Sequence, residues 1–109
     1  MGLVIQDRPE FEATVVVRTA HLRGEFKARF VALPSSKLDE LQAAAVRAGK
    51  GPEGLLYDVC TWFETVQTPR GEIVHDGPDS LARLMDWPGI GPAMAKTYWR
   101  TLWEEASGN

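Results

Sequence analysis

Two segments with alternating apolar and polar residues, joined by a short connection, constrain the fold of this chain more than any other feature. Residues 11–18 and 25–30 both show the two-residue period of a half-buried β-strand. Residues 19–24 between them are few enough for a hairpin. A hairpin with one apolar face is not stable alone, so the rest of the chain must cover it. The apolar positions are Phe11, Ala13, Val15 and Val17 in the first segment and Phe26, Ala28 and Phe30 in the second. Residues 3–5 can add a third, edge strand, limited by Pro9.

The residues after the hairpin favour helices. Pro34 ends the second strand, and Ser36 followed by Asp39 resembles a capping box that starts a helix. Helix-period stripes and Gly/Pro breaks predict four helices, over residues 35–48, 53–66, 79–86 and 92–106. In the helix predicted over 53–66, the apolar stripe is Leu56, Val59, Phe63 and Val66, broadened by Leu55 and Trp62. Turn signals on both sides of residues 72–74 indicate a short strand there. Strands followed by helices predict one α+β domain over residues 1–109, with the hairpin region in 1–33 and the helical region in 35–106.

Composition excludes several classes of protein. The net charge of −3 argues against a dedicated nucleic-acid binder, and the single cysteine excludes an internal disulfide. The N-terminus lacks a secretory signal, and no apolar run approaches the roughly 20 residues that span a bilayer. We therefore expect a cytoplasmic protein of the host cell with no membrane partner. Residues 1–50 carry a net charge of +2 and residues 51–109 a net charge of −5. This asymmetry is compatible with self-association or an acidic docking face, and also with two simply solvated halves.

The residue types that carry catalysis are scarce and scattered. His21 and His75 lie in predicted turns, far apart in sequence, and too few thiols and imidazoles are present for a zinc site. Cys60 lies inside the helix predicted over 53–66, where a free cysteine packs as a small apolar side chain. The sequence therefore predicts a protein that is not an enzyme and that has no catalytic residues, no metal site and no cofactor.

Aromatic residues and methionine are frequent in the last third of the chain. Exposed side chains of these types mark protein interfaces because they supply a large contact area. The candidates for a partner-binding surface are Trp87, Met94, Trp99 and Trp103. The alternative is that they belong to the core, since tryptophan is highly buried on average.

The segment from Leu84 to Ala95 resembles a helix-hairpin-helix motif. Its hairpin reads Trp87, Pro88, Gly89, Ile90 and Gly91, and the small residue Ala95 follows four positions later. The resemblance implies that the backbone N–H groups of Gly89 and Gly91 contact a DNA phosphate, with ionic contacts from Lys96 and Arg100. Pro92 departs from the motif, because it removes one N–H donor. The alternative is a tight turn between two helices, since glycine and proline are the usual turn residues.

Over nearly its whole length the chain resembles a family of phage and prophage tail assembly chaperones. The matching segments, in order, are residues 11–15, 26–30, 38–41, 62–64 and 81–89, followed by an Ala-rich aromatic helix that ends at Ser107-Gly108. Members of that family bind the tape-measure protein, keep it soluble and help to recruit tail-tube subunits. The resemblance thus implies a non-catalytic chaperone whose partners are the tape-measure protein and the tail-tube protein. Self-association is a further expectation, and DNA binding is the alternative function.

Overall fold

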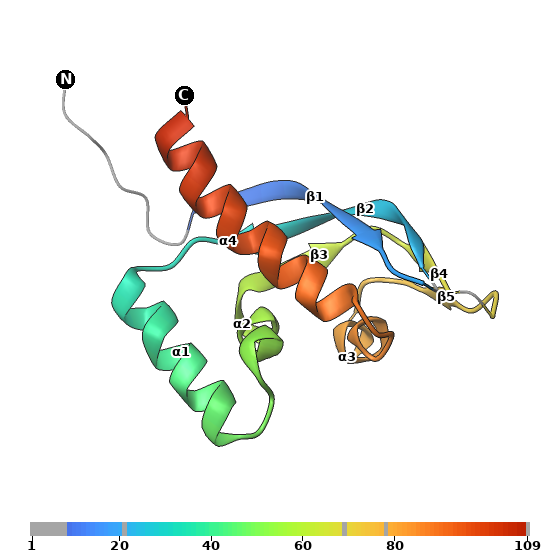
Figure 1. Ribbon diagram of the computed structural model, residues 1–109, viewed down its shortest axis with the longest axis horizontal. Coiled ribbons are helices and arrows are strands. Elements are labelled where there is room, and N and C mark those ends of the chain that lie inside the picture. The colour runs from blue at the N-terminus through green and yellow to red at the C-terminus, as the bar shows by residue number, and fades with distance from the viewer. Residues whose placement is uncertain (1–8, 21, 69, 78, 109) are drawn as a thin grey trace.

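The predicted hairpin forms the central part of the structure, a computed structural model that describes residues 9–20, 22–68, 70–77 and 79–108 (Figure 1). Strands β1 (Glu10–Arg18) and β2 (Arg23–Val31) pair antiparallel over nine residues each. The turn is closed by two bonds: the Thr19 N–H donates to the Leu22 carbonyl at 2.8 Å, and the Leu22 N–H donates to Thr19 Oγ1 at 3.0 Å. The alternating apolar positions all lie on the inner face, as the sequence predicts. The expected edge strand at residues 3–5, like His21, lies outside the described residues.

The prediction of a helix over residues 53–66 is wrong. A short 3-10 helix (Pro52–Leu55) and one helical turn, α2 (Leu56–Val59), lead directly into strand β3 (Cys60–Phe63). β3 pairs antiparallel with β2, which gives a three-stranded sheet in the order β1-β2-β3. Thr61, Trp62 and Phe63 are β-branched or aromatic, residue types that fit a pleated surface, and the second edge of β2 offers unpaired backbone groups. Sheet pairing therefore prevails over the helix-like spacing of the apolar residues.

Strand β3 is joined to the hairpin by side chains as well as by backbone bonds. The guanidinium of Arg29 lies 4.8 Å from the ring centroid of Trp62, its cross-strand partner on β3. The Lys27 N–H donates to Glu64 Oε1 at 3.0 Å, and the Glu64 N–H donates to the Lys27 carbonyl at 2.8 Å. These contacts place Trp62 on the sheet and not on a helix face.

The short strand predicted at residues 72–74 is confirmed. It appears as β5 (Ile73–Val74), which pairs antiparallel with β4 (Val66–Gln67) in a separate two-stranded sheet. Thr68 fixes the turn between them, because its Oγ1 accepts a hydrogen bond from the Glu72 N–H at 3.1 Å.

Helix α1 (Ser35–Arg47) matches its prediction in extent but not in its start. The capping position is Pro34, and no side chain caps the helix, so the predicted capping box of Ser36 and Asp39 does not form. The helix buries Leu38 and Ala45, half-buries Leu41 and Gln42 and leaves its other residues exposed. Only a narrow stripe of α1 therefore contributes to the core.

Helices α3 (Ser80–Met85) and α4 (Ile90–Gly108) complete the chain. α4 begins two residues before the predicted Pro92 and packs along β1, with Tyr98 as its central contact (Figure 1). The Tyr98 ring centroid lies 5.8 Å from that of Phe11 and 5.4 Å from that of Phe30, and its hydroxyl donates to the Val31 carbonyl at 2.8 Å. One core thus joins the sheet to the helices. Its largest fully buried side chains are Tyr98, Phe30, Phe63, Leu55, Leu56, Leu84, Met94, Val15, Val59 and Val74.

Candidate binding surfaces

The four residues predicted to bind a partner have different environments. Met94 has no exposed surface and lies in the core, so its assignment to a binding surface is corrected. Its position on α4 faces the sheet, and an unbranched apolar side chain fills that contact well. Trp87 and Trp99 are half-buried against the core. Trp103 is 67% exposed.

Two of these tryptophans lie together on the C-terminal part of α4. Trp99 and Trp103 are one helical turn apart, and the half-buried Leu102 lies beside them. The Trp99 ring is positioned by Tyr98, against which it packs edge-on with 5.5 Å between the ring centroids. We refer to Trp99, Leu102 and Trp103 as the aromatic surface. It presents a rigid apolar contact area at the end of α4.

The glycines of the helix-hairpin-helix resemblance contact the protein itself. Gly89 has φ +96°, and a Cβ atom placed on it would lie 2.5 Å from Thr19 Cγ2. Gly91 is buried, and a Cβ atom there would lie 3.2 Å from Glu53 Cγ. The glycines therefore allow α4 to approach the β1–β2 turn and the 3-10 helix. The Glu53 side chain also lies next to the start of α4, at the end of the helix that would have to attract a phosphate.

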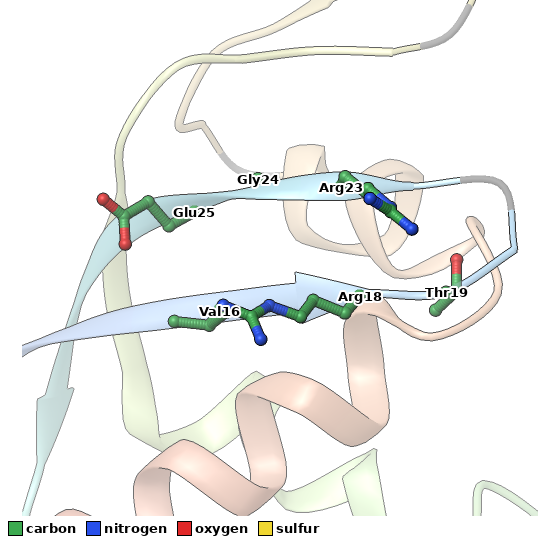
Figure 2. A pocket seen from close by; sticks show the side chains of 6 residues that line it. All are labelled: Val16, Arg18, Thr19, Arg23, Gly24 and Glu25. Atoms are coloured by element: carbon green, nitrogen blue, oxygen red, sulfur yellow. The ribbon is translucent and has the colours of Figure 1, made fainter.

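The basic residues of the same resemblance line an open groove. Lys96 and Arg100 face β1 across a groove of about 500 Å³, whose other side includes Val16 and Arg18. A second hollow of about 580 Å³ shares Val16 and Arg18 and extends to Arg23 at the end of the hairpin (Figure 2). We refer to the two hollows together as the cationic groove. Its four cations are Arg18, Arg23, Lys96 and Arg100, all exposed.

Arg18 and Arg23 were not predicted as site residues from the sequence pattern. The alternation in the hairpin did place Arg18 on the polar face. Nothing in the sequence indicates that α4 packs along β1, and this packing brings Arg18 to the same groove as Lys96 and Arg100.

Among the residue types used in catalysis, Cys60 and Asp76 line one pocket together with Tyr57. The pKa of the Cys60 thiol is raised to about 11, mainly by burial; the hydrogen bond that the thiol donates to the Trp62 carbonyl lowers the pKa in part, and the Asp76 carboxylate adds to the increase. The thiol is therefore protonated at neutral pH and is a poor nucleophile. His75 is exposed, and its Nδ1 lies 3.1 Å from Thr65 Oγ1. No group of three or more His, Cys, Asp or Glu residues that could hold a metal ion occurs among the described residues.

None of the described helices is both long enough and apolar enough to cross a bilayer. Comparisons with protein-family models, with curated proteins and with solved structures gave no match. The resemblance to tail assembly chaperones therefore depends on the sequence segments given above.

Proposed function

We propose that this chain is a phage tail assembly chaperone that binds the tape-measure protein through the aromatic surface of α4. The observation that carries the proposal is the exposure of Trp103, which is 67% exposed, whereas Tyr98 on the same helix is fully buried and Trp99 is half-buried. Exposed tryptophan is enriched at the centres of protein interfaces, where it contributes more binding energy than other residues. A tape-measure protein is long and helical, so its apolar stripes fit against such a surface.

The arrangement of the aromatic surface supports a binding role. Trp99 is already ordered by its contact with Tyr98, so little rotamer freedom is lost when a partner helix packs on it. The aromatic surface is small, which favours reversible binding of a partner. It lies outside the core, so the core stays buried when the partner leaves. In this proposal the chaperone covers apolar stripes of the tape-measure protein until tail-tube subunits assemble around it.

The experiment is co-expression of the chain with the tape-measure protein from the same tail gene cluster. We expect the tape-measure protein to be soluble with the wild-type chain and to co-purify with it, also after nuclease treatment. Trp103→Ala should move most of the tape-measure protein to the insoluble fraction, because it removes the most exposed part of the aromatic surface.

Tyr57→Ala is the matched control, since Tyr57 is also an exposed aromatic residue, at 47%, but lies on α2. It should leave solubility and co-purification unchanged. Equal effects of both substitutions would contradict the assignment of the aromatic surface. Failure of the wild-type chain to keep the tape-measure protein soluble would contradict the proposed function itself.

The DNA-binding alternative is less well supported. It requires the backbone N–H groups of Gly89 and Gly91 to reach a phosphate, whereas both glycines pack against the protein and Glu53 lies beside Gly91. Its basic residues, Lys96 and Arg100, are nevertheless exposed in a groove.

A further inference from the structure

The described lining of the cationic groove combines four positively charged side chains with the carboxylate of Glu25 on β2, so positive charge is in excess. Arg18 and Arg23 are direct cross-strand partners in the β1–β2 register, an unfavourable position for two like charges. Among the residues whose side chains the structure describes, no carboxylate, Glu25 included, forms an ion pair with any of the four cations, whereas Arg29, Lys37 and Arg83 each have one. The net charge of the whole chain is −3, so this concentration of positive charge is local. An anionic ligand would relieve the repulsion that the fold maintains.

The groove is also partly apolar. Val16 is 42% exposed on the outer face of β1, and Pro92 and Ala93 of α4 line the groove opposite it. A ligand that fills the groove must therefore offer apolar groups between its negative charges. A phosphate backbone does not offer them, whereas a helix with carboxylates on both sides of an apolar stripe does.

The spacing of the cations fits a helical ligand. Lys96 and Arg100 are four residues apart on α4, which places them one turn apart on the same side of the helix. Carboxylates one turn apart on a partner helix have the same spacing as Lys96 and Arg100, so each of the two cations can pair with one carboxylate at the same time. Arg18 lies beside Val16 on β1, and Arg23 and Glu25 lie across from them on β2 (Figure 2). The two arginines can meet carboxylates at the other margin of that helix.

We propose that the cationic groove binds an acidic, amphipathic helical segment of a partner protein. Val16, Pro92 and Ala93 contact its apolar stripe, and the four arginine and lysine side chains pair with its carboxylates. The groove and the aromatic surface are formed by different residues, although Arg100 adjoins Trp99 and Trp103 on α4. The proposal holds whether or not the partner is a tail protein.

The test uses a fluorescein-labelled synthetic helix of roughly 20 residues, with Leu and Ala on one face flanked by Glu. Binding to the full-length chain is measured by fluorescence anisotropy at low ionic strength. We expect saturable binding that Arg18→Glu combined with Arg100→Glu weakens by about tenfold or more, since buried or close charge pairs dominate such contacts. A peptide with Lys in place of every Glu should not bind.

The matched control combines Arg47→Glu with Arg70→Glu, which changes the net charge equally at exposed arginines outside the groove. Its affinity for the acidic peptide should stay within about twofold of wild type. Circular dichroism of both double variants verifies that they remain folded, because all four arginines are exposed.

The apolar part of the groove is tested by Val16→Ser, which should weaken binding of the acidic peptide and leave binding of a labelled DNA duplex unchanged. Three outcomes would overturn the proposal. The first is no binding of the acidic peptide to the wild-type chain, and the second is equal weakening in the groove and control variants. The third is groove-dependent binding of the duplex in preference to the peptide, which would establish a nucleic-acid site instead. Since none of these measurements involves Trp103 or the tape-measure protein, failure here leaves the proposed function standing.

Discussion

Tyr98 and Trp103 lie five positions apart on the same helix and have opposite environments. Tyr98 is fully buried, whereas Trp103 is 67% exposed. Five positions correspond to about 140° around the axis of an α-helix, so the two side chains point to different sides of α4. Tyr98 packs on Phe11 and Phe30 of the sheet. Figure 1 shows the C-terminal part of α4 extending past the sheet. Large aromatic side chains of one helix thus form core on the side that another element covers and a candidate interface where none covers them.

The largest effect on stability should come from the buried half of α4. Met94→Ala should lower the free energy of unfolding by about 4 kcal/mol, because it leaves a cavity beneath a fully buried position. Urea denaturation measures this value. A loss below about 1 kcal/mol would mean that Met94 is not in the core, and would break the distinction between the two halves of the helix.

Gly89→Ala should have the next largest effect and lower the free energy of unfolding by about 3 kcal/mol, since it combines a positive φ with a clash against Thr19. Gly49→Ala is the control, because Gly49 has φ +75° and no atom within 4 Å of its added Cβ, so it measures backbone strain alone. Adding Thr19→Ser to Gly89→Ala removes Cγ2, keeps the hydroxyl bond to Leu22 and should recover part of the loss in urea denaturation. Equal effects of Gly89→Ala and Gly49→Ala would argue against close packing of α4 on the hairpin.

The pH dependence of stability should reveal the burial of Tyr98. Burial raises the pKa of Tyr98 from its ordinary value of 10.0 to about 12. The folded state therefore holds the phenol proton more tightly, so its contribution is complete below pH 10 and is lost as the pH rises towards 12. The free energy of unfolding should fall by about 2 kcal/mol over this interval. Tyr98→Phe should lack this component of the decline in urea denaturation at high pH. If absorbance of the phenolate shows that Tyr98 titrates near pH 10, the ring is not buried.

The smallest effect on stability should come from the exposed half of α4. Trp103→Ala should change the free energy of unfolding by less than about 0.5 kcal/mol, because its side chain is mostly in water. Urea denaturation of Trp103→Ala and of Met94→Ala then compares the loss of stability in the exposed and the buried half of α4. A loss of 2 kcal/mol or more would place Trp103 in the core and remove the aromatic surface from consideration.

Local pattern was sufficient to predict the hairpin, α1 and α4. In the hairpin the period of two assigns every apolar residue to one face, and no distant residue can change that assignment. The same pattern failed at residues 60–63, where Val59 and Phe63 are four positions apart and suit either a helix or the two ends of a short strand. The candidate site was predictable only in part. Trp99 and Trp103 were predicted from residue type and stay a prediction, Met94 is buried in the core, and Arg18 and Arg23 were not predicted.

The sequence by itself determined the two-residue alternation of β1 and β2, the helical stripe of α4 and the scarcity of catalytic residue types. These properties depend on neighbours along the chain, since backbone periodicity and side-chain chemistry are local. The tertiary structure decided that residues 60–63 form a strand, because the free edge of β2 offers it hydrogen bonds from more than thirty residues away. It also decided that Met94 is buried while Trp103 is exposed, and that Arg18 shares a groove with Arg100. Each of these outcomes depends on which element, distant in sequence, packs against the residue, and local sequence does not specify that packing.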